Sequence, residues 1–140
     1  MKMILPVGKK KAWRLITSRR GICSWFPVYL EGKIAVGEQL QFAWPGEQSV
    51  DYKVIYLGPK HSSFRLQRTD GVKVSVYLHG RLTILTLEVE YPRTQRDRCG
   101  YASEVARWAF FLANLKSAAL KGPDLRNNLP GRSWAMGFID

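Results

Sequence analysis

The residues that decide the fold lie near the C-terminus and read NLKSAALKGPDLRNNLP, residues 114–130. They end a longer segment whose apolar residues recur at steps of three or four, the spacing of one helix face: Tyr101, Val105, Trp108, Leu112, Leu115 and Ala119. Gly122 and Pro123 then stop the pattern, as these residues do at helix ends. The segment predicts one amphipathic helix over 101–121, which at about 1.5 Å per residue spans roughly 30 Å and is long enough to cross a sheet.

Between residues 39 and 91 the apolar period becomes two, which is typical of strands with one buried face. Three turn signals interrupt the alternation, namely Gly58-Pro59, Asp70-Gly71 and His79-Gly80. Pro92 ends the last run. A short apolar run at 3–7 predicts an edge strand, and residues 9–17 and 18–26 predict two small helices. The pattern predicts an antiparallel meander whose two faces differ in polarity.

Four segments carry a family resemblance: AWRLITSRRGICSWF (12–26), VGEQLQFAW (36–44), VIYLGPKHSSFRL (54–66) and WAFFLANLKSAALKGPDLR (108–126). Together they resemble the START-like (SRPBCC) superfamily, and within it the bacterial homologues of the activator of the heat-shock-90 ATPase (AHSA family). The resemblance implies an α+β helix-grip fold, in which a curved antiparallel sheet of six or seven strands wraps around a long C-terminal helix with two small helices. It also implies a single domain over 1–127, followed by a C-terminal apolar extension over 128–140.

That extension departs from the family pattern, which usually ends soon after the Asp-Leu-Arg exit, and the first strand is shorter than the family's. The extension contains the large apolar side chains Trp134, Met136, Phe138 and Ile139. We expect it to cover a sheet edge of its own chain or of a second copy, because exposed apolar side chains forgo favourable burial. The protein is accordingly expected to be a monomer or a homodimer.

Apolar and aromatic residues assigned to the inner side of the sheet and helix either fill the core or line a ligand cavity. They are Phe42, Trp44, Tyr52, Val54, Tyr56, Phe64, Leu66, Val76, Leu87, Val105, Trp108 and Leu112. START-like domains commonly hold lipids, polyketides or other apolar molecules. The resemblance therefore implies a non-enzymatic module that binds a small hydrophobic ligand, with Tyr52 and Tyr56 as sources of hydroxyl groups. A cyclase or hydrolase using the same cavity is a third hypothesis, for which the sequence offers no catalytic residue.

The charge of the chain suggests an alternative function. The 22 Lys and Arg residues exceed the 11 Asp and Glu residues and give a formal net charge of +11. The expected basic surface comprises Lys9, Lys10, Lys11, Arg19, Arg20, Arg93, Arg96 and Arg98. Such a surface favours an acidic protein partner, as in a protein-interaction domain similar to the chaperone co-activators of the AHSA family. Nucleic acid is disfavoured, because the basic clusters fall on helices and loops whereas the aromatic residues are assigned to inward strand positions.

Metal and cofactor chemistry are not indicated. His61 and His79 fall on separate loops, and Cys23 and Cys99 lie far from both in the sequence, so no metal site is expected. None of the twelve glycines is placed to form a phosphate-binding loop, and no cofactor is expected.

The last strand contains two glutamates on one face, Glu88 and Glu90. We expect both to face solvent, because the alternate positions of this strand are apolar and are expected to point inward. No apolar run near the N-terminus is long enough for a signal sequence or a membrane span, so a cytoplasmic protein is expected.

Overall fold

The computed structural model of the chain describes residues 1–80, 83–92 and 98–126. The predictions made for Arg93, Arg96 and the extension 128–140 fall outside these residues, as does the side chain of Arg98. The elements are, in chain order, β1 (Lys2–Leu5), α1 (Lys9–Thr17), α2 (Arg19–Cys23), β2 (Tyr29–Glu31), β3 (Gln39–Ala43), β4 (Val50–Leu57), the 3-10 turn η1 (Pro59–His61), β5 (Ser63–Arg68), β6 (Lys73–His79), β7 (Thr83–Glu90) and α3 (Arg98–Ala119).

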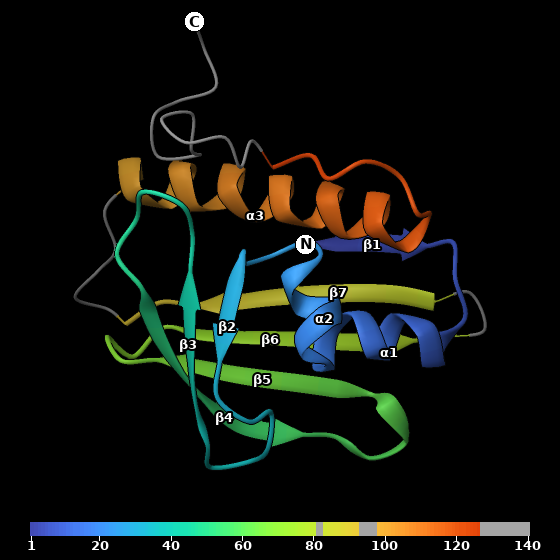
Figure 1. Cartoon of the computed structure of the whole chain (residues 1–140), viewed down its shortest axis with the longest axis horizontal. Coiled ribbons are helices and arrows are strands. Elements are labelled where there is room, and N and C mark those ends of the chain that lie inside the picture. Colours follow the sequence, from blue (N-terminus) through green and yellow to red (C-terminus); the bar gives the residue numbers. More distant parts are fainter. Residues whose placement is uncertain (81–82, 93–97, 127–140) are drawn as a thin grey trace, which may run out of the picture.

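The strands form one sheet in the order β1-β7-β6-β5-β4-β3-β2, and every neighbouring pair is antiparallel. Figure 1 shows that the sheet is curved. Helix α3 runs along it, and the small helices α1 and α2 lie on the same side. The structure therefore confirms the predicted α+β class and the helix-grip architecture, with seven strands in the described part of the chain.

Alternation along the strands sorts the side chains between the two faces of the sheet. Phe42, Val54 and Leu87 point to the face that meets the helices, and each is at most 2% exposed. The opposite face meets solvent, and the glutamates Glu88 and Glu90 of β7 are exposed there, as predicted. The inner face of the sheet packs against the helices and contains the core.

The buried face of α3 begins later than its sequence pattern predicts. Trp108 and Leu115 are buried, whereas Val105 is 37% exposed. The prediction that Val105 lines the interior is therefore wrong. The face of α3 that meets the sheet runs through Glu104, Trp108, Phe111 and Leu115, at steps of four, three and four, so position 105 lies beside that face.

A bulge in β4 explains a second wrong prediction. The pairing of β4 with β5 shifts between Val54 and Tyr56, because Val54 opposes Leu66 while Tyr56 opposes Arg65. Such an extra residue inverts the inward and outward positions that follow it. Tyr56 is therefore 41% exposed on the outer face, where the Arg65 guanidinium lies over its ring, and it does not line the interior.

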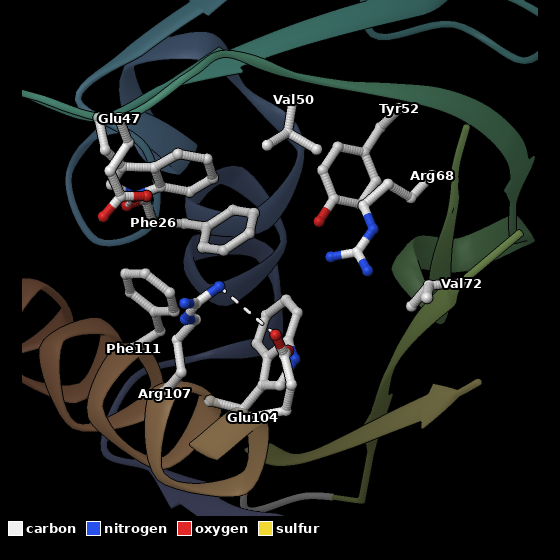
Figure 2. A pocket seen from close by; sticks show the side chains of 11 residues that line it. Phe26, Glu47, Val50, Tyr52, Arg68, Val72, Glu104, Arg107 and Phe111 are labelled. Carbon is white, nitrogen blue, oxygen red and sulfur yellow. Dashed lines mark hydrogen bonds and ion pairs between the residues drawn. The ribbon is translucent and has the colours of Figure 1, made fainter. Parts of the chain in front are cut away.

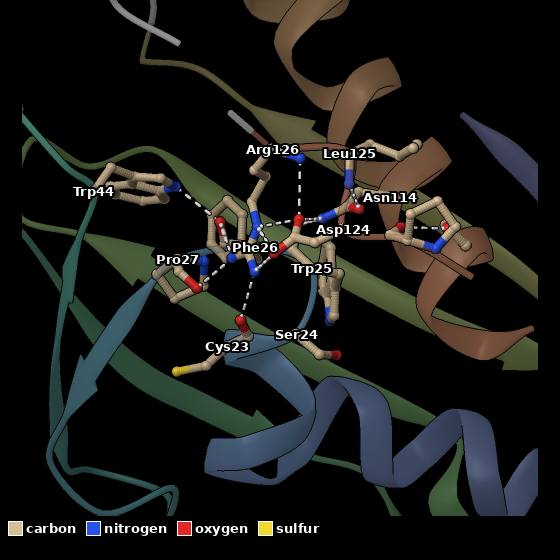
Figure 3. Close-up of polar contacts among 12 residues, drawn as sticks. Cys23, Ser24, Trp25, Phe26, Pro27, Trp44, Asn114, Asp124, Leu125 and Arg126 are labelled. Carbon is tan, nitrogen blue, oxygen red and sulfur yellow. Dashed lines mark hydrogen bonds and ion pairs between the residues drawn. The ribbon is translucent and has the colours of Figure 1, made fainter. Parts of the chain in front are cut away.

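The Asp-Leu-Arg exit after α3 forms a polar clamp on the turn between α2 and β2 (Figure 3). We define this clamp as Asn114, Asp124 and Arg126. Arg126 donates through Nη1 to the carbonyl oxygen of Pro27 at 2.7 Å and through Nη2 to that of Cys23 at 2.9 Å, and it forms an ion pair with Asp124. The first bond satisfies a carbonyl group of the turn, and the second satisfies the carbonyl group of Cys23 at the end of α2.

Asn114 completes the clamp from within α3, where its residue is 0% exposed. Its amide nitrogen donates to the carbonyl oxygen of Trp25 at 3.1 Å, and its side-chain oxygen accepts from the backbone N–H of Leu125 at 2.8 Å. A buried amide is tolerated only when it is hydrogen-bonded. Asn114 therefore fixes Trp25 and the exit segment against α3, and with Trp25 it fixes the position of Phe26.

Candidate functional site

A pocket opens between the inner face of the sheet and the first half of α3 (Figure 2). We call it the mouth pocket; the space inside it that the centre of a water molecule can occupy is about 50 Å³. Its lining consists of Phe26, Trp44, Glu47, Val50, Tyr52, Arg68, Val72, Glu104, Arg107, Trp108 and Phe111. Five of these eleven residues are aromatic, so the walls offer flat apolar surfaces with polar groups between them.

The sheet provides two of the polar groups, from residues that oppose each other across β4 and β5. Tyr52 pairs in register with Arg68, and Figure 2 shows the Tyr52 hydroxyl and the Arg68 guanidinium pointing toward α3. Burial raises the pKa of Tyr52, and the positive charge of Arg68 and its hydrogen bond oppose this shift only in part. Tyr52 therefore keeps its proton at neutral pH and can both donate and accept a hydrogen bond.

Arg68 is oriented by the turn that follows β5. Its Nε donates to Asp70 Oδ1 at 2.8 Å and its Nη2 to Asp70 Oδ2 at 2.6 Å, the bidentate arrangement that suits arginine. The hydrogen bonds that Arg68 donates to Asp70 hold the pKa of Arg68 above its usual value. The Arg68 charge is thus locally compensated, while its guanidinium remains in the pocket wall.

Helix α3 provides the opposing polar groups. Arg107 Nη1 lies 3.4 Å from Glu104 Oε1, and the Tyr91 hydroxyl donates to Glu104 Oε2 at 3.1 Å. Burial and the Glu104 carboxylate raise the pKa of Tyr91 to about 12. Glu104 is therefore held from two sides. The mouth pocket as a whole carries two cationic and two anionic side chains, since Glu47 is the fourth charged residue of its lining.

A second, apolar pocket lies between the sheet and the small helices. We call it the inner pocket; the space inside it that the centre of a water molecule can occupy is about 20 Å³. It is lined by Ile16, Ile22, Trp25, Phe26, Phe64, Leu66, Val74, Val76 and Trp108. None of these side chains carries a charge.

The rings of Phe26 and Trp108 line both pockets. They stack with centroids 5.1 Å apart and planes at 24°. Phe26 also makes edge contacts with the rings of Phe42, Trp44 and Phe111. Aromatic packing therefore fills the centre of the space between sheet and helix and leaves one pocket on each side.

The predicted lining residues distribute over these two pockets and the packed core. Trp44, Tyr52 and Trp108 line the mouth pocket, and Phe64, Leu66, Val76 and Trp108 line the inner pocket. Phe42, Val54, Leu87 and Leu112 are buried in the core without lining either pocket. Tyr56 and Val105 line neither pocket and are exposed to solvent.

Sequence reasoning missed the charged residues of the mouth pocket, although the pattern contained a signal for them. Arg68 continues the inward alternation of Phe64 and Leu66 along β5. Glu104 precedes Trp108 by four residues, so it shares the buried face of α3. In both cases a charged residue at an inward position marks a site that a purely apolar pattern does not reveal.

Most described residues of the predicted basic surface are exposed, and one of them, Lys11, forms a hydrogen bond within the protein. Lys10, Arg19 and Arg20 are exposed on α1 and α2, and Lys9 is half-buried. Lys11 is exposed too, but its ammonium group donates to the carbonyl oxygen of Ala119 at 3.0 Å. Lys11 thus binds the C-terminal end of α3, where a positive charge is favourable.

The described residues show neither a metal-ligand cluster nor a membrane-spanning helix. They contain no group of three or more His, Cys, Asp and Glu side chains arranged to hold a metal ion. None of their helices is both long enough and apolar enough to cross a membrane.

Comparison with solved structures identifies the class of fold. The chain superposes on the Aha1 dimer protein of Colwellia psychrerythraea with a TM-score of 0.72 and 21% identity, covering 85% of this chain and 92% of that one. For the AHSA1-like protein of Aeromonas hydrophila the TM-score is 0.69 at 13% identity, over 86% of this chain and 90% of that one. For DynU16, a putative protein in the dynemicin biosynthetic locus, it is 0.78 at 22% identity, over 96% of this chain and 55% of that one.

At these identities the likeness is one of fold, and it confirms the predicted helix-grip fold. Within that class, the structures similar to this chain include AHSA1-like proteins, in line with the resemblance of its sequence segments. Neither a scan of protein-family models nor a search of curated proteins gave a match.

Proposed function

We propose that the protein is a non-enzymatic binding module that holds a small hydrophobic, aromatic molecule in the mouth pocket. The observation that carries this proposal is the lining, in which five aromatic side chains surround hydrogen-bonding groups from both the sheet and α3. Aromatic walls with a few placed polar groups are the usual composition of a small-molecule site. The fold supports the same proposal, because other START-like domains bind apolar ligands between sheet and helix.

The charges of the pocket favour an uncharged ligand with a hydroxyl group. The two cationic and two anionic side chains of the lining balance, and Arg68 and Arg107 each have an acidic partner. A charged ligand would have to compete with these ion pairs. A hydroxyl group can instead donate to Glu104 and accept from Arg68 or Tyr52 without separating them.

The test uses naphthol as the probe and titration calorimetry as the measurement. We expect Tyr52→Phe, which removes one buried hydroxyl, to weaken naphthol binding about threefold to tenfold, as for the loss of one hydrogen bond. Tyr101→Phe is the matched control, because Tyr101 is 64% exposed on α3 and does not line the pocket. Absence of naphthol binding to the wild type, together with no co-purifying small molecule in native mass spectrometry, would refute the proposal.

A second candidate is an interaction of the α1–α2 surface with an acidic protein segment. Residues 1–30 contain no Asp or Glu, and Lys10, Arg14, Arg19 and Arg20 are exposed on the two helices. None of the four forms an ion pair within the described residues. Such a surface attracts polyanions and loses that attraction in salt.

Polyglutamate is a suitable probe for this second function. Reversing the charge of Lys10 and Arg14 to glutamate is expected to abolish polyglutamate binding at low salt. The same reversal at Lys53 and Lys73, which are exposed on the outer face of the sheet, serves as the control for net charge. Equal loss in both variants would show that the attraction comes from total charge and not from the α1–α2 surface.

A further inference from the structure

The side of α3 that faces away from the sheet carries no charge over about three turns. We call it the far face of α3, and its exposed apolar residues are Ala102, Val105, Ala106, Ala109 and Ala113. The charged residues between positions 101 and 115 are Glu104 and Arg107, and both line the mouth pocket instead. A surface helix normally places its charged residues on the side away from the core. The far face therefore has the composition of a covered surface.

In the described part of the chain, no helix or strand covers this face. Figure 1 shows the sheet on one side of α3 and no labelled element on the other. Val105 is 37% exposed, and Tyr101 at the beginning of the helix is 64% exposed. Apolar side chains left in water forgo favourable burial, and contiguous exposed apolar patches mark interaction sites. The far face accordingly predicts an occupant.

The segment that follows α3 turns back along the helix (Figure 1). Ser117 Oγ donates to the carbonyl oxygen of Pro123 at 2.6 Å, and the backbone N–H of Leu125 donates to Asn114 Oδ1 at 2.8 Å. Between Pro123 and Leu125 the chain thus passes from the level of Ser117 to that of Asn114, toward the first half of α3. The clamp then fixes Arg126, the last described residue of this segment. The chain is therefore held beside the middle of α3 and directed toward its far face.

The extension that comes next in the sequence lies outside the described residues, and it contains the apolar side chains needed to cover such a face: Trp134, Met136, Phe138 and Ile139. Trp134 is eight residues after Arg126, and eight extended residues reach about 26 Å. The far face from Ala102 to Ala113 is about 17 Å long. The extension is thus long enough to place Trp134 anywhere on it.

We propose that the far face of α3 is the docking surface for the chain's own C-terminal extension, 128–140, which binds in cis through Trp134 and the apolar residues after it. The helix is favoured over a sheet edge, because the edge strands β1 and β2 have four and three residues. Strands of this length offer few unpaired backbone groups. The proposal is independent of any ligand in the mouth pocket.

Fluorine NMR of the full chain labelled with 5-fluorotryptophan tests this proposal. The signal of Trp134 is assigned by its loss in Trp134→Phe. Docking is expected to shift this signal away from its position in the urea-unfolded protein and to protect it from broadening by a soluble gadolinium chelate.

Two substitutions then locate the docking surface. Ala106→Glu and Ala109→Glu each place a charge within the far face, where burial of that charge is unfavourable. We expect either one to release the extension, so that the Trp134 signal moves to its unfolded position. Gln39→Glu is the matched control, because it adds the same charge at an exposed position of β3. The signals of the buried Trp25 and Trp108 show that each variant is folded.

The outcomes separate this proposal from the other possible occupants. A wild-type Trp134 signal at its unfolded position would refute docking. If the signal is shifted and neither glutamate moves it, the extension binds elsewhere and the far face is refuted as its site. Sedimentation at the same protein concentrations tests docking in cis, for which a monomer with a shifted signal is expected. A dimer whose Trp134 signal returns to the unfolded position on dilution would refute docking in cis and assign the face to a second copy.

Discussion

Replacing Arg126 by methionine should show how much of the fold depends on the clamp after α3. The side chain of Arg126 is 8% exposed, so methionine preserves most of its apolar stem while removing the guanidinium. The substitution deletes the hydrogen bonds to the carbonyl oxygens of Pro27 and Cys23 and the ion pair with Asp124. These bonds join the turn after α2 to a segment about a hundred positions later in the chain.

The expected cost follows from the burial of the partners. A hydrogen bond from a charged donor contributes about 1.5–3 kcal/mol, and two such bonds are lost to backbone carbonyls. The Asp124 side chain is 39% exposed, so water can replace part of its ion pair and that share of the loss is small. We therefore expect Arg126→Met to lower the free energy of unfolding by about 3–6 kcal/mol.

Urea unfolding followed by tryptophan fluorescence and by circular dichroism measures this loss, and coincident transitions justify a two-state treatment. The matched control is Arg20→Met, an exposed arginine on α2 for which a change within about 0.5 kcal/mol is expected. Repeating the substitution in an Asp124→Ala background separates the carbonyl bonds from the ion pair. A loss below about 1 kcal/mol for Arg126→Met would refute the clamp as a main determinant of stability.

Three further predictions concern the core and the titratable groups beside it. Trp108→Ala is expected to cost about 3–5 kcal/mol in urea unfolding, the range for truncating a buried aromatic residue, and a cost below about 1 kcal/mol would contradict its burial. Tyr91→Phe is expected to remove one late step, near pH 12, from the ultraviolet tyrosinate titration. Neutral Tyr91 stabilises the fold below the ordinary tyrosine pKa of about 10, and this stability is lost as the pH rises through the pKa of Tyr91 in the folded protein. Burial opposes the ionisation of Asp124, but hydrogen bonds from Arg126 outweigh it and lower the Asp124 pKa. The resulting stability is present above the ordinary aspartate pKa of about 4 and is lost as the pH falls below it. In Asp124→Asn, the free energy of unfolding should therefore fall less steeply with decreasing pH in this acid range.

The elements of the fold could be predicted from the sequence because their apolar periods are long and regular. The stripe through Trp108, Leu112 and Leu115 identifies α3, and the alternation from residue 39 onward identifies the sheet. These patterns reflect which side chains are buried. Along a helix or strand, the regular repeat of side-chain direction determines which residues share the buried face. They predict the faces of most residues in the middle of each element.

The errors arise where a single residue shifts the register. At the bulge between Val54 and Tyr56, one additional residue turns Tyr56 outward, and an alternating pattern contains no sign of it. On α3 the stripe of apolar residues continues to Val105, but the buried face continues through Glu104 instead. An apolar pattern excludes charged residues by construction, so it cannot assign Glu104 or Arg68 to the interior.

The backbone around Phe26 determines how the stacked rings of Phe26 and Trp108 can move. The carbonyl oxygen of Phe26 accepts from Trp44 Nε1 at 2.8 Å, and its neighbours Trp25 and Pro27 accept from Asn114 and Arg126. Moving this turn as a whole would break all three bonds and leave carbonyl groups without partners. Rotation of the Phe26 ring about its side-chain bonds breaks none of them. Movement of the Phe26 ring is therefore a side-chain motion on a fixed backbone. A molecule that enters the mouth pocket is expected to change the ring contacts of Phe26 while the clamp stays intact.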